Sequence, residues 1–352
     1  MRRKVEAWDH DPHQSIEPGR KVLVVVTLLG NIGANTEVVA LGEAGAKKFP
    51  HVAPNLLFDA GKGHHVLGAL SRAEACWHQA LDGFEQQGLA MAQTWPLLEL
   101  ASVLRDRGDL TAARELATRA MEIARSGGHP IAEANAWRAL ANISELAGEI
   151  GRTREANERA RELCALTGML AGEAACLGTE GKLLQREGRL VEAEECFRRA
   201  LEFDRLTGEV RSEATSLNRL GEVQRLRRQF AAAIDLYERA GELYRNCRDL
   251  DGEGAVTSNL GLVYKELGDL EKAEQLQRRS IDIHQRIADL EGEAHSWLNL
   301  GNILLERKDL AQAEACYREA KRLYEQGHFA HGRAGALQNL AAVILYRGGN
   351  PR

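Results

Sequence analysis

The chain repeats itself every 40 residues. The triplet Asn259-Leu260-Gly261 returns as Asn299-Leu300-Gly301 and again, with alanine in third place, as Asn339-Leu340-Ala341. With the same step, glycine recurs at Gly68, Gly108, Gly148, Gly188 and Gly268, and a small residue recurs at Ala73, Ala113, Ala193, Ala233, Ala273 and Ala313. These columns stay in phase from residue 68 to residue 348 without an insertion. They therefore indicate one array of stacked repeats, because independent domains would not keep a common period.

Each repeat has the pattern of two helices. Residues 254–267 place Val256, Leu260 and Val263 on one face at helical spacing. Gly268 then tolerates the left-handed backbone that ends a helix, and Asp269 can accept a hydrogen bond from a free N–H group of the next helix. A second helix over residues 270–287 follows. The small residues are expected where the two helices approach closely.

Composition supports a folded helical protein. Of the 352 residues 44% are hydrophobic and only 5% are aromatic, and the formal net charge is −5. That much apolar surface excludes a disordered chain, and the acidic balance argues against a general nucleic-acid binder, which needs a basic field. The longest apolar run, residues 22–29, is too short to span a bilayer. We expect a cytoplasmic protein without a membrane segment, and the arginine-rich composition suggests a bacterial one.

The repeated columns resemble the tetratricopeptide repeat (TPR) family. In the clearest repeat the family pattern is carried by Trp297, Leu300, Gly301, Asp309, Leu310, Ala313, Tyr317 and Ala320. The 40-residue step is similar to the longer variant found in Pins-type adaptors and bacterial TPR regulators. The resemblance implies an all-α, right-handed superhelical solenoid of antiparallel helix pairs. It covers residues 68–348, with about six full repeats and a half repeat at each end, followed by a tail over residues 349–352.

Residues 1–67 do not follow the repeat. We expect a flexible tail, a strand over residues 21–29, a glycine-containing turn and a helix over residues 37–48. This element could be a cap or the remnant of an α/β domain. Alternatively, the turn with Gly30 and Gly33 could bind a nucleotide or phosphate, or the strand could pair with another chain. Residues 53–67 could also form a degenerate first helix, which Gly61 and Gly63 weaken.

The sequence offers no recognisable catalytic or metal-binding motif. The six cysteines form no CxxC pair, and Cys76, Cys196 and Cys316 share one column, where a small apolar side chain packs well. His10 and His13 lie in the expected flexible tail, and His64 has no third ligand nearby in sequence. We therefore predict no enzyme activity, no cofactor and no metal.

A binding surface remains as the functional candidate. In the TPR family the first helices of successive repeats line a concave groove that reads a peptide. The residues of this chain at those positions are Arg138, Asn142, Asn218, Arg219, Arg225, Asn259, Lys265, Asn299, Asn302 and Asn339. An asparagine amide suits this task, because it presents a donor and an acceptor together and can pair with a peptide backbone. The competing interpretation is that these asparagines bridge neighbouring repeats.

The leading hypothesis is thus a non-enzymatic scaffold that binds a peptide or helix of a protein partner. The first alternative is a regulatory or sensor module whose superhelix changes shape on peptide binding to control an effector. The second is phosphate or nucleotide binding at the N-terminal turn. A carboxylate clamp, as in chaperone-binding TPR proteins, matches only in part, because Thr179 and Thr215 replace an asparagine and a lysine. The apolar helix expected over residues 331–347 suggests self-association.

Overall fold

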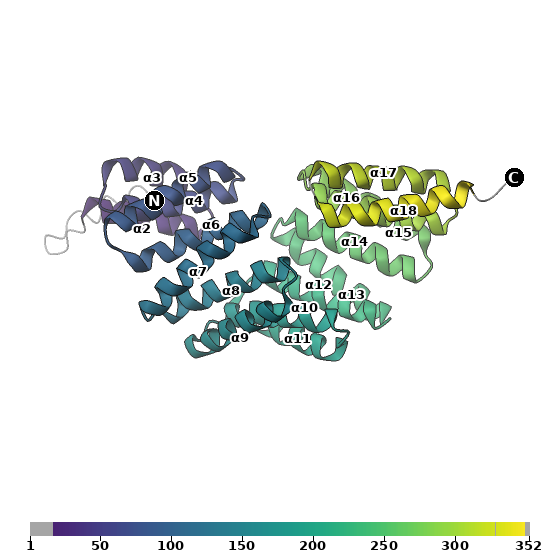
Figure 1. The fold of residues 1–352 in the computed structure, drawn as a ribbon, viewed down its shortest axis with the longest axis horizontal. Helices are drawn as coiled ribbons and strands as arrows, with labels where there is room; N and C mark the ends of the chain where they lie inside the picture. Colours follow the sequence, from purple (N-terminus) through teal and green to yellow (C-terminus); the bar gives the residue numbers. More distant parts are fainter. Residues whose placement is uncertain (1–16, 328, 349–352) are drawn as a thin grey trace. The chain divides into compact units, whose positions relative to one another are not determined.

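The computed structural model describes residues 17–327 and 329–348. Within these ranges the regular elements are helices, and no β-strand occurs. The chain divides into two compact units, which we call unit 1, ending at Gly172, and unit 2, beginning at Glu173 (Figure 1). The predicted all-α array of helix pairs is confirmed. None of the helices in the described part of the chain is both long and apolar enough to cross a bilayer.

The helices follow one another through short turns, so contacting neighbours run antiparallel. The elements up to the unit boundary are α2 (Pro18–Asn31), α3 (Asn35–Lys48), α4 (Ala53–Val66), α5 (Leu70–Gln86), the 3₁₀ turn η2 (Ala90–Gln93), α6 (Thr94–Asp106), α7 (Leu110–Ser126), α8 (Pro130–Leu146) and α9 (Ile150–Thr167). Then come α10 (Leu170–Arg186), α11 (Leu190–Thr207), α12 (Val210–Leu226), α13 (Phe230–Asn246), α14 (Leu250–Glu266), α15 (Leu270–Arg286), α16 (Leu290–Glu306), α17 (Leu310–Gln326) and α18 (Ala330–Gly348). From α4 onward, even-numbered helices are the first helices of the repeats and odd-numbered helices the second.

A glycine of the first helix faces a ring of the second helix in several repeats. A Cβ added at Gly221 would lie 2.7 Å from Cε1 of Tyr237, and one at Gly181 would lie 2.6 Å from Cε1 of Phe197. Both rings are fully buried. The glycine column is therefore set by packing: the ring of each pair lies against the bare backbone of its partner helix.

The same contact extends the repeat toward the N-terminus. Gly61 of α4 packs against the indole of Trp77 in α5, which is fully buried. Gly61 stands 40 residues before Ala101 of the same column. Residues 53–66 are thus a first helix paired with α5, and Gly61 fits that helix because the large Trp77 ring leaves no room for a side chain.

First helices form one layer of unit 2. Helix α12 contacts α14, α14 contacts α16 and α16 contacts α18, whereas successive second helices contact each other less. In Figure 1, α16, α17 and α18 lie side by side at the C-terminal end. Since the first helices lie closer together than the second ones, their layer is the inner one of the array within unit 2.

Left-handed residues end the first helices. Glycine takes this conformation at Gly108, Gly148, Gly188 and Gly268, with φ between 73° and 84°. Arg228 and Lys308 hold the same place in their repeats with φ of 59° and 64°. A residue with a Cβ in this conformation is strained by about 1–2 kcal/mol.

We expect Lys308→Gly to stabilise unit 2 by about 0.5–1 kcal/mol, because relief of that strain exceeds the entropy that glycine loses on folding. Urea unfolding followed by circular dichroism measures the change. The matched control is Lys308→Ala, which removes the same long side chain but keeps the Cβ. An equal gain in both variants would show that the backbone conformation is not the cause.

The predicted strand over residues 21–29 is wrong, because these residues lie within α2. Pro18 is at the first turn of this helix, a position that proline favours. Val22, Val26 and Leu29 then share one helical face and pack in one cluster with Val38 of α3 and Leu56 of α4. Burial of this face outweighs the weak preference of valine for strands.

The N-terminal turn is not part of the strand–turn–helix unit from which phosphate binding was predicted. It joins α2 to α3 and not a strand to a helix. The N–H groups of Gly33, Ala34 and Asn35 donate to Gly30, Leu29 and Gly33, respectively, so they are used within the turn. The predicted helix over residues 37–48 is present as α3, which begins at Asn35.

The last helix keeps apolar side chains on its outer face. Leu337, Ile344 and Leu345 of α18 are exposed, whereas Ala336 and Val343 are buried against α16 and α17. The predicted tail over residues 349–352, the first 16 residues of the N-terminal element and hence His10 and His13 lie outside the described residues.

Candidate functional site

All ten predicted site residues lie on first helices and are half-buried. Eight of them belong to unit 2: Asn218, Arg219 and Arg225 on α12, Asn259 and Lys265 on α14, Asn299 and Asn302 on α16, and Asn339 on α18. Arg138 and Asn142 are on α8 of unit 1. The inner layer of unit 2 therefore collects most of the predicted site, and we call these eight residues the inner polar row.

The asparagines of the inner polar row connect neighbouring repeats. The amide nitrogen of Asn259 donates to Oδ1 of Asn218 over 3.0 Å. Asn299 donates to the hydroxyl of Ser258 over 3.2 Å, and Asn339 donates to Oδ1 of Asn302 over 3.1 Å. Each bond runs from one first helix to the preceding one, so the bridging interpretation describes a contact that these side chains make.

Bridging leaves hydrogen-bonding capacity on each amide. A primary amide has two N–H donors and an oxygen with two lone pairs, and each bridge takes one donor. Within the described residues, Oδ1 of Asn259, Asn299 and Asn339 accepts no hydrogen bond. The bridges thus fix the orientation of the amides and leave their oxygens available to an incoming donor.

The cations of the inner polar row are paired with carboxylates. Arg225 of α12 forms an ion pair with Glu266 of α14, and Lys265 of α14 lies 2.7 Å from Glu306 of α16. Arg219 approaches Glu222 of its own helix at 3.4 Å. These partly exposed pairs place alternating charges beside the amides, and each is worth little to stability.

A buried glutamine on a second helix holds Ser258, the residue that accepts the bridge from Asn299. Gln277 of α15, fully buried, accepts from the hydroxyl of Ser258 at 2.9 Å and donates to the Ser258 carbonyl at 2.8 Å. It stands in the column that holds Tyr237 and Tyr317 elsewhere, and that polar exception was the sequence signal for this contact. In the next repeat the buried Tyr317, whose pKa burial raises to about 12, donates to Asn302 over 2.8 Å.

The two predicted residues of unit 1 have different surroundings. Arg138 donates to Asn135 of its own helix over 3.2 Å. Asn142 forms no hydrogen bond to the described part of the chain. Neither belongs to a run of bonds between first helices such as the one in unit 2.

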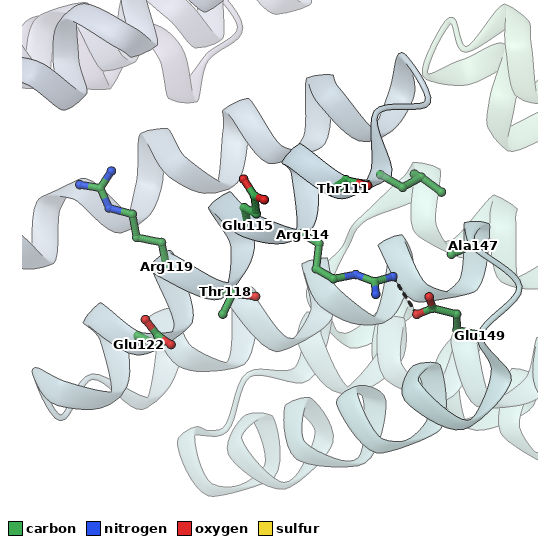
Figure 2. Close-up of a pocket in the computed structure, with 9 residues that line it drawn as sticks. Thr111, Arg114, Glu115, Thr118, Arg119, Glu122, Ala147 and Glu149 are labelled. Atoms are coloured by element: carbon green, nitrogen blue, oxygen red, sulfur yellow. Dashed lines mark hydrogen bonds and ion pairs between the residues drawn. The ribbon is translucent and has the colours of Figure 1, made fainter.

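Unit 1 has an open pocket on a second helix. Figure 2 shows the lining residues Thr111, Arg114, Glu115, Thr118, Arg119 and Glu122 of α7 together with Ala147 and Glu149, with Arg114 pointing toward Glu149; the pocket has a volume of about 630 Å³. Arg114 and Glu149 are 2.7 Å apart, and Arg119 pairs with Glu85. The arginine charges that line the pocket are neutralised by carboxylates of unit 1.

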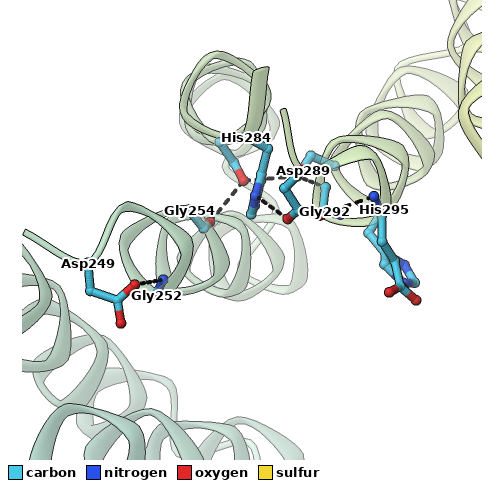
Figure 3. Close-up of polar contacts among 10 residues, drawn as sticks. Asp249, Gly252, Gly254, His284, Asp289, Gly292 and His295 are labelled. Carbon is cyan, nitrogen blue, oxygen red and sulfur yellow. Dashed lines mark hydrogen bonds and ion pairs between the residues drawn. The ribbon is translucent and has the colours of Figure 1, made fainter. Parts of the chain in front are cut away.

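A histidine cluster in unit 2 links three helices. The ring of His284 lies between Gly254 and Gly292, and its Nδ1 is 2.8 Å from Oδ2 of Asp289 (Figure 3). Asp289 also accepts from the N–H groups of Glu291 and Gly292, so it caps α16. The bond from His284, followed by those from the backbone, lowers the pKa of Asp289. This arrangement fixes the turn between α15 and α16.

Several solved structures share this fold. The STAND protein with a tetratricopeptide repeat sensor from Pyrococcus horikoshii matches 96% of this chain and 51% of its own, with 15% identity and a TM-score of 0.67. A Rap protein in complex with Competence and Sporulation Factor matches 93% of this chain and 98% of its own, with 14% identity and a TM-score of 0.64. BtubC from P. vanneervenii matches 62% and 91%, with 22% identity and a TM-score of 0.51. No curated protein sequence matches this chain.

Sequence profiles of the tetratricopeptide repeat match residues 97–126, 172–246 and 252–326. Together these segments make up just over half of the chain. The profile, the 40-residue columns and the helix pairs agree, so the chain belongs to the tetratricopeptide repeat family of protein-interaction scaffolds.

Proposed function

We propose that this protein is a non-enzymatic scaffold that binds an extended segment of a partner protein along the inner polar row of unit 2. The observation that carries the proposal is the run of oriented amides on α14, α16 and α18. Three asparagines at one place in successive repeats each donate to the preceding first helix, and their oxygens accept no bond from the residues that the structure describes.

The arrangement suits a peptide backbone better than a compact ligand. Amides that recur once per repeat can accept N–H groups of an extended chain at intervals, independently of its side chains. Orientation by the bridges reduces the side-chain entropy that binding would otherwise cost. The flanking pairs Arg225–Glu266 and Lys265–Glu306 offer both signs of charge, and these can select among peptide sequences.

The test begins with peptides selected on the wild-type protein from a displayed random library. Their affinity is then measured by fluorescence anisotropy for wild type and for Asn259→Ala/Asn299→Ala/Asn339→Ala. Loss of three neutral hydrogen bonds of about 0.5–1.5 kcal/mol each predicts roughly a 10- to 2000-fold weaker Kd. Circular dichroism must first show that the variant is folded, since each change also removes a bridge between repeats.

The matched control moves the same chemistry to second helices. Asn246, Gln275 and Gln326 are exposed amides on α13, α15 and α17, and their triple alanine variant should bind as wild type does. Equal affinity of wild type and the Asn259/Asn299/Asn339 variant would exclude the inner polar row as the site.

X-ray scattering of the same complexes tests the regulatory alternative, which requires a change in radius of gyration on binding.

A further inference from the structure

Three potential metal ligands from three helices converge in unit 1. Glu43 of α3, His64 of α4 and Cys76 of α5 place one ligand atom each within 4.8 Å of the other two. Nε2 of His64 lies 2.8 Å from Oε1 of Glu43. The sequence alone showed no third ligand near His64, because the three residues lie on three different helices and meet only when these helices pack together.

Glu43 departs most from its repeat column, His64 stands in a column that mixes leucines with Ser144 and Gln224, and Cys76 shares its column with other cysteines. One or more 40-residue steps after Glu43, second helices carry Ile123, Leu163, Phe203, Leu243 and Ile283. The steps after His64 include Leu104, Leu184 and Leu304 on first helices. His64 is 97% buried, with an exposure of 3%, and Cys76 has an exposure of 7%. A buried imidazole needs polar partners, and here the Glu43 carboxylate and the Cys76 thiol both stand within reach of it.

We propose that Glu43, His64 and Cys76 bind one zinc-like divalent cation that joins α3, α4 and α5. Carboxylate, imidazole and thiolate are the ligand types of protein zinc sites, and three protein ligands with an open fourth position are a common arrangement. Sulfur and nitrogen donors disfavour magnesium and calcium, which prefer oxygen. On binding, the ion replaces the hydrogen bond between His64 and Glu43 and displaces the proton of the Cys76 thiol, which is released to solvent.

The geometry allows both entry and coordination. The Glu43 side chain is 42% exposed, so an ion can reach the buried His64 and Cys76 from solvent on that side. Zinc–ligand distances of about 2.0–2.3 Å put ligand atoms about 3.5 Å apart in a tetrahedron. In the structure the three ligand atoms lie within 4.8 Å of one another, so binding draws them together by about an ångström.

The experiment uses the full chain, treated with a chelator, kept reduced and titrated with Zn²⁺ or Co²⁺. We expect one equivalent to bind, with a thiolate-to-cobalt charge-transfer absorption. Cys76→Ser should remove that absorption, and His64→Gln or Glu43→Gln should weaken Zn²⁺ binding at least tenfold, since even groups behind metal ligands change affinity by about 10–100-fold. Zinc should also raise the Tm of wild type more than that of these variants.

Cys316→Ser is the matched control, because Cys316 is buried in the same repeat column and should leave the cobalt spectrum unchanged. Equal loss in both serine variants, or unaltered binding in Cys76→Ser, would overturn the proposal. If Cys76→Ser still binds the ion and Asp289→Asn does not, the ion lies at the His284 cluster and the proposal is wrong. If Cys76→Ser does not fold, X-ray absorption of the wild-type zinc complex decides, because a coordination sphere without sulfur contradicts the site.

Discussion

Gly301→Leu should unfold the C-terminal repeats of unit 2. A Cβ at Gly301 would lie 2.5 Å from Cε1, 2.8 Å from Cδ1 and 3.0 Å from Cζ of Tyr317. The ring cannot withdraw, because Tyr317 is fully buried and its hydroxyl is bonded to Asn302. Overpacking by a single methyl group costs about 1–3 kcal/mol of unfolding free energy, which is the loss expected for Gly301→Ala. The larger side chain of Gly301→Leu should cost more than that.

Urea unfolding and hydrogen exchange of α16–α18 measure the effect. In a repeat array each repeat depends mainly on its neighbours, so the loss of protection should begin in these helices. Gly178→Ala on α10 is the control: a Cβ there meets nothing within 4 Å, and alanine should stabilise the helix by about 0.5–1 kcal/mol. Similar losses in Gly301→Ala and Gly178→Ala would refute the packing explanation.

Trp77→Ala should destabilise unit 1 by about 3–5 kcal/mol, the usual cost of removing a large buried aromatic side chain. Trp77 is fully buried, packs with Leu81, Leu97 and Leu100, and donates its indole N–H to the Phe58 carbonyl over 3.3 Å. Alanine leaves a cavity that Gly61 on the facing helix cannot fill. The change also leaves that carbonyl without its indole donor.

The midpoint of urea unfolding, monitored by circular dichroism, should fall for Trp77→Ala with little change in the m-value. Trp95→Ala provides the comparison, because Trp95 of α6 keeps 37% of its surface exposed and should lose much less stability. Equal losses for the two tryptophans would contradict the role assigned to the Gly61–Trp77 contact.

Periodicity predicted the repeats because each helix pair must satisfy the same packing. The columns of Gly221, Gly301 and Ala313 recur since a larger residue would separate paired helices, and that steric rule is local. The prediction of a strand over residues 21–29 was wrong because local sequence preference did not decide their structure. Their valines favour a strand locally, but contacts with α3 and α4, which are distant in sequence, decide for a helix.

The predicted surface residues show the same division. Sequence placed Asn259, Asn299 and Asn339 in one column, and the structure confirms that they share the first helices of successive repeats. Whether they bridge repeats depended on the side chains that stand opposite them, Asn218, Ser258 and Asn302. That they also bind a peptide stays a prediction.

The sequence by itself determined the family, the period and the pairing of helices, because these follow from short-range spacing of apolar and small residues. Only the tertiary structure decided that α2 is a helix, that Gln277 holds Ser258 and that Glu43, His64 and Cys76 meet. The physical reason is distance along the chain. A hydrogen bond or a ligand cluster needs atoms within a few ångströms, and only packing of separate helices brings residues from different helices that close.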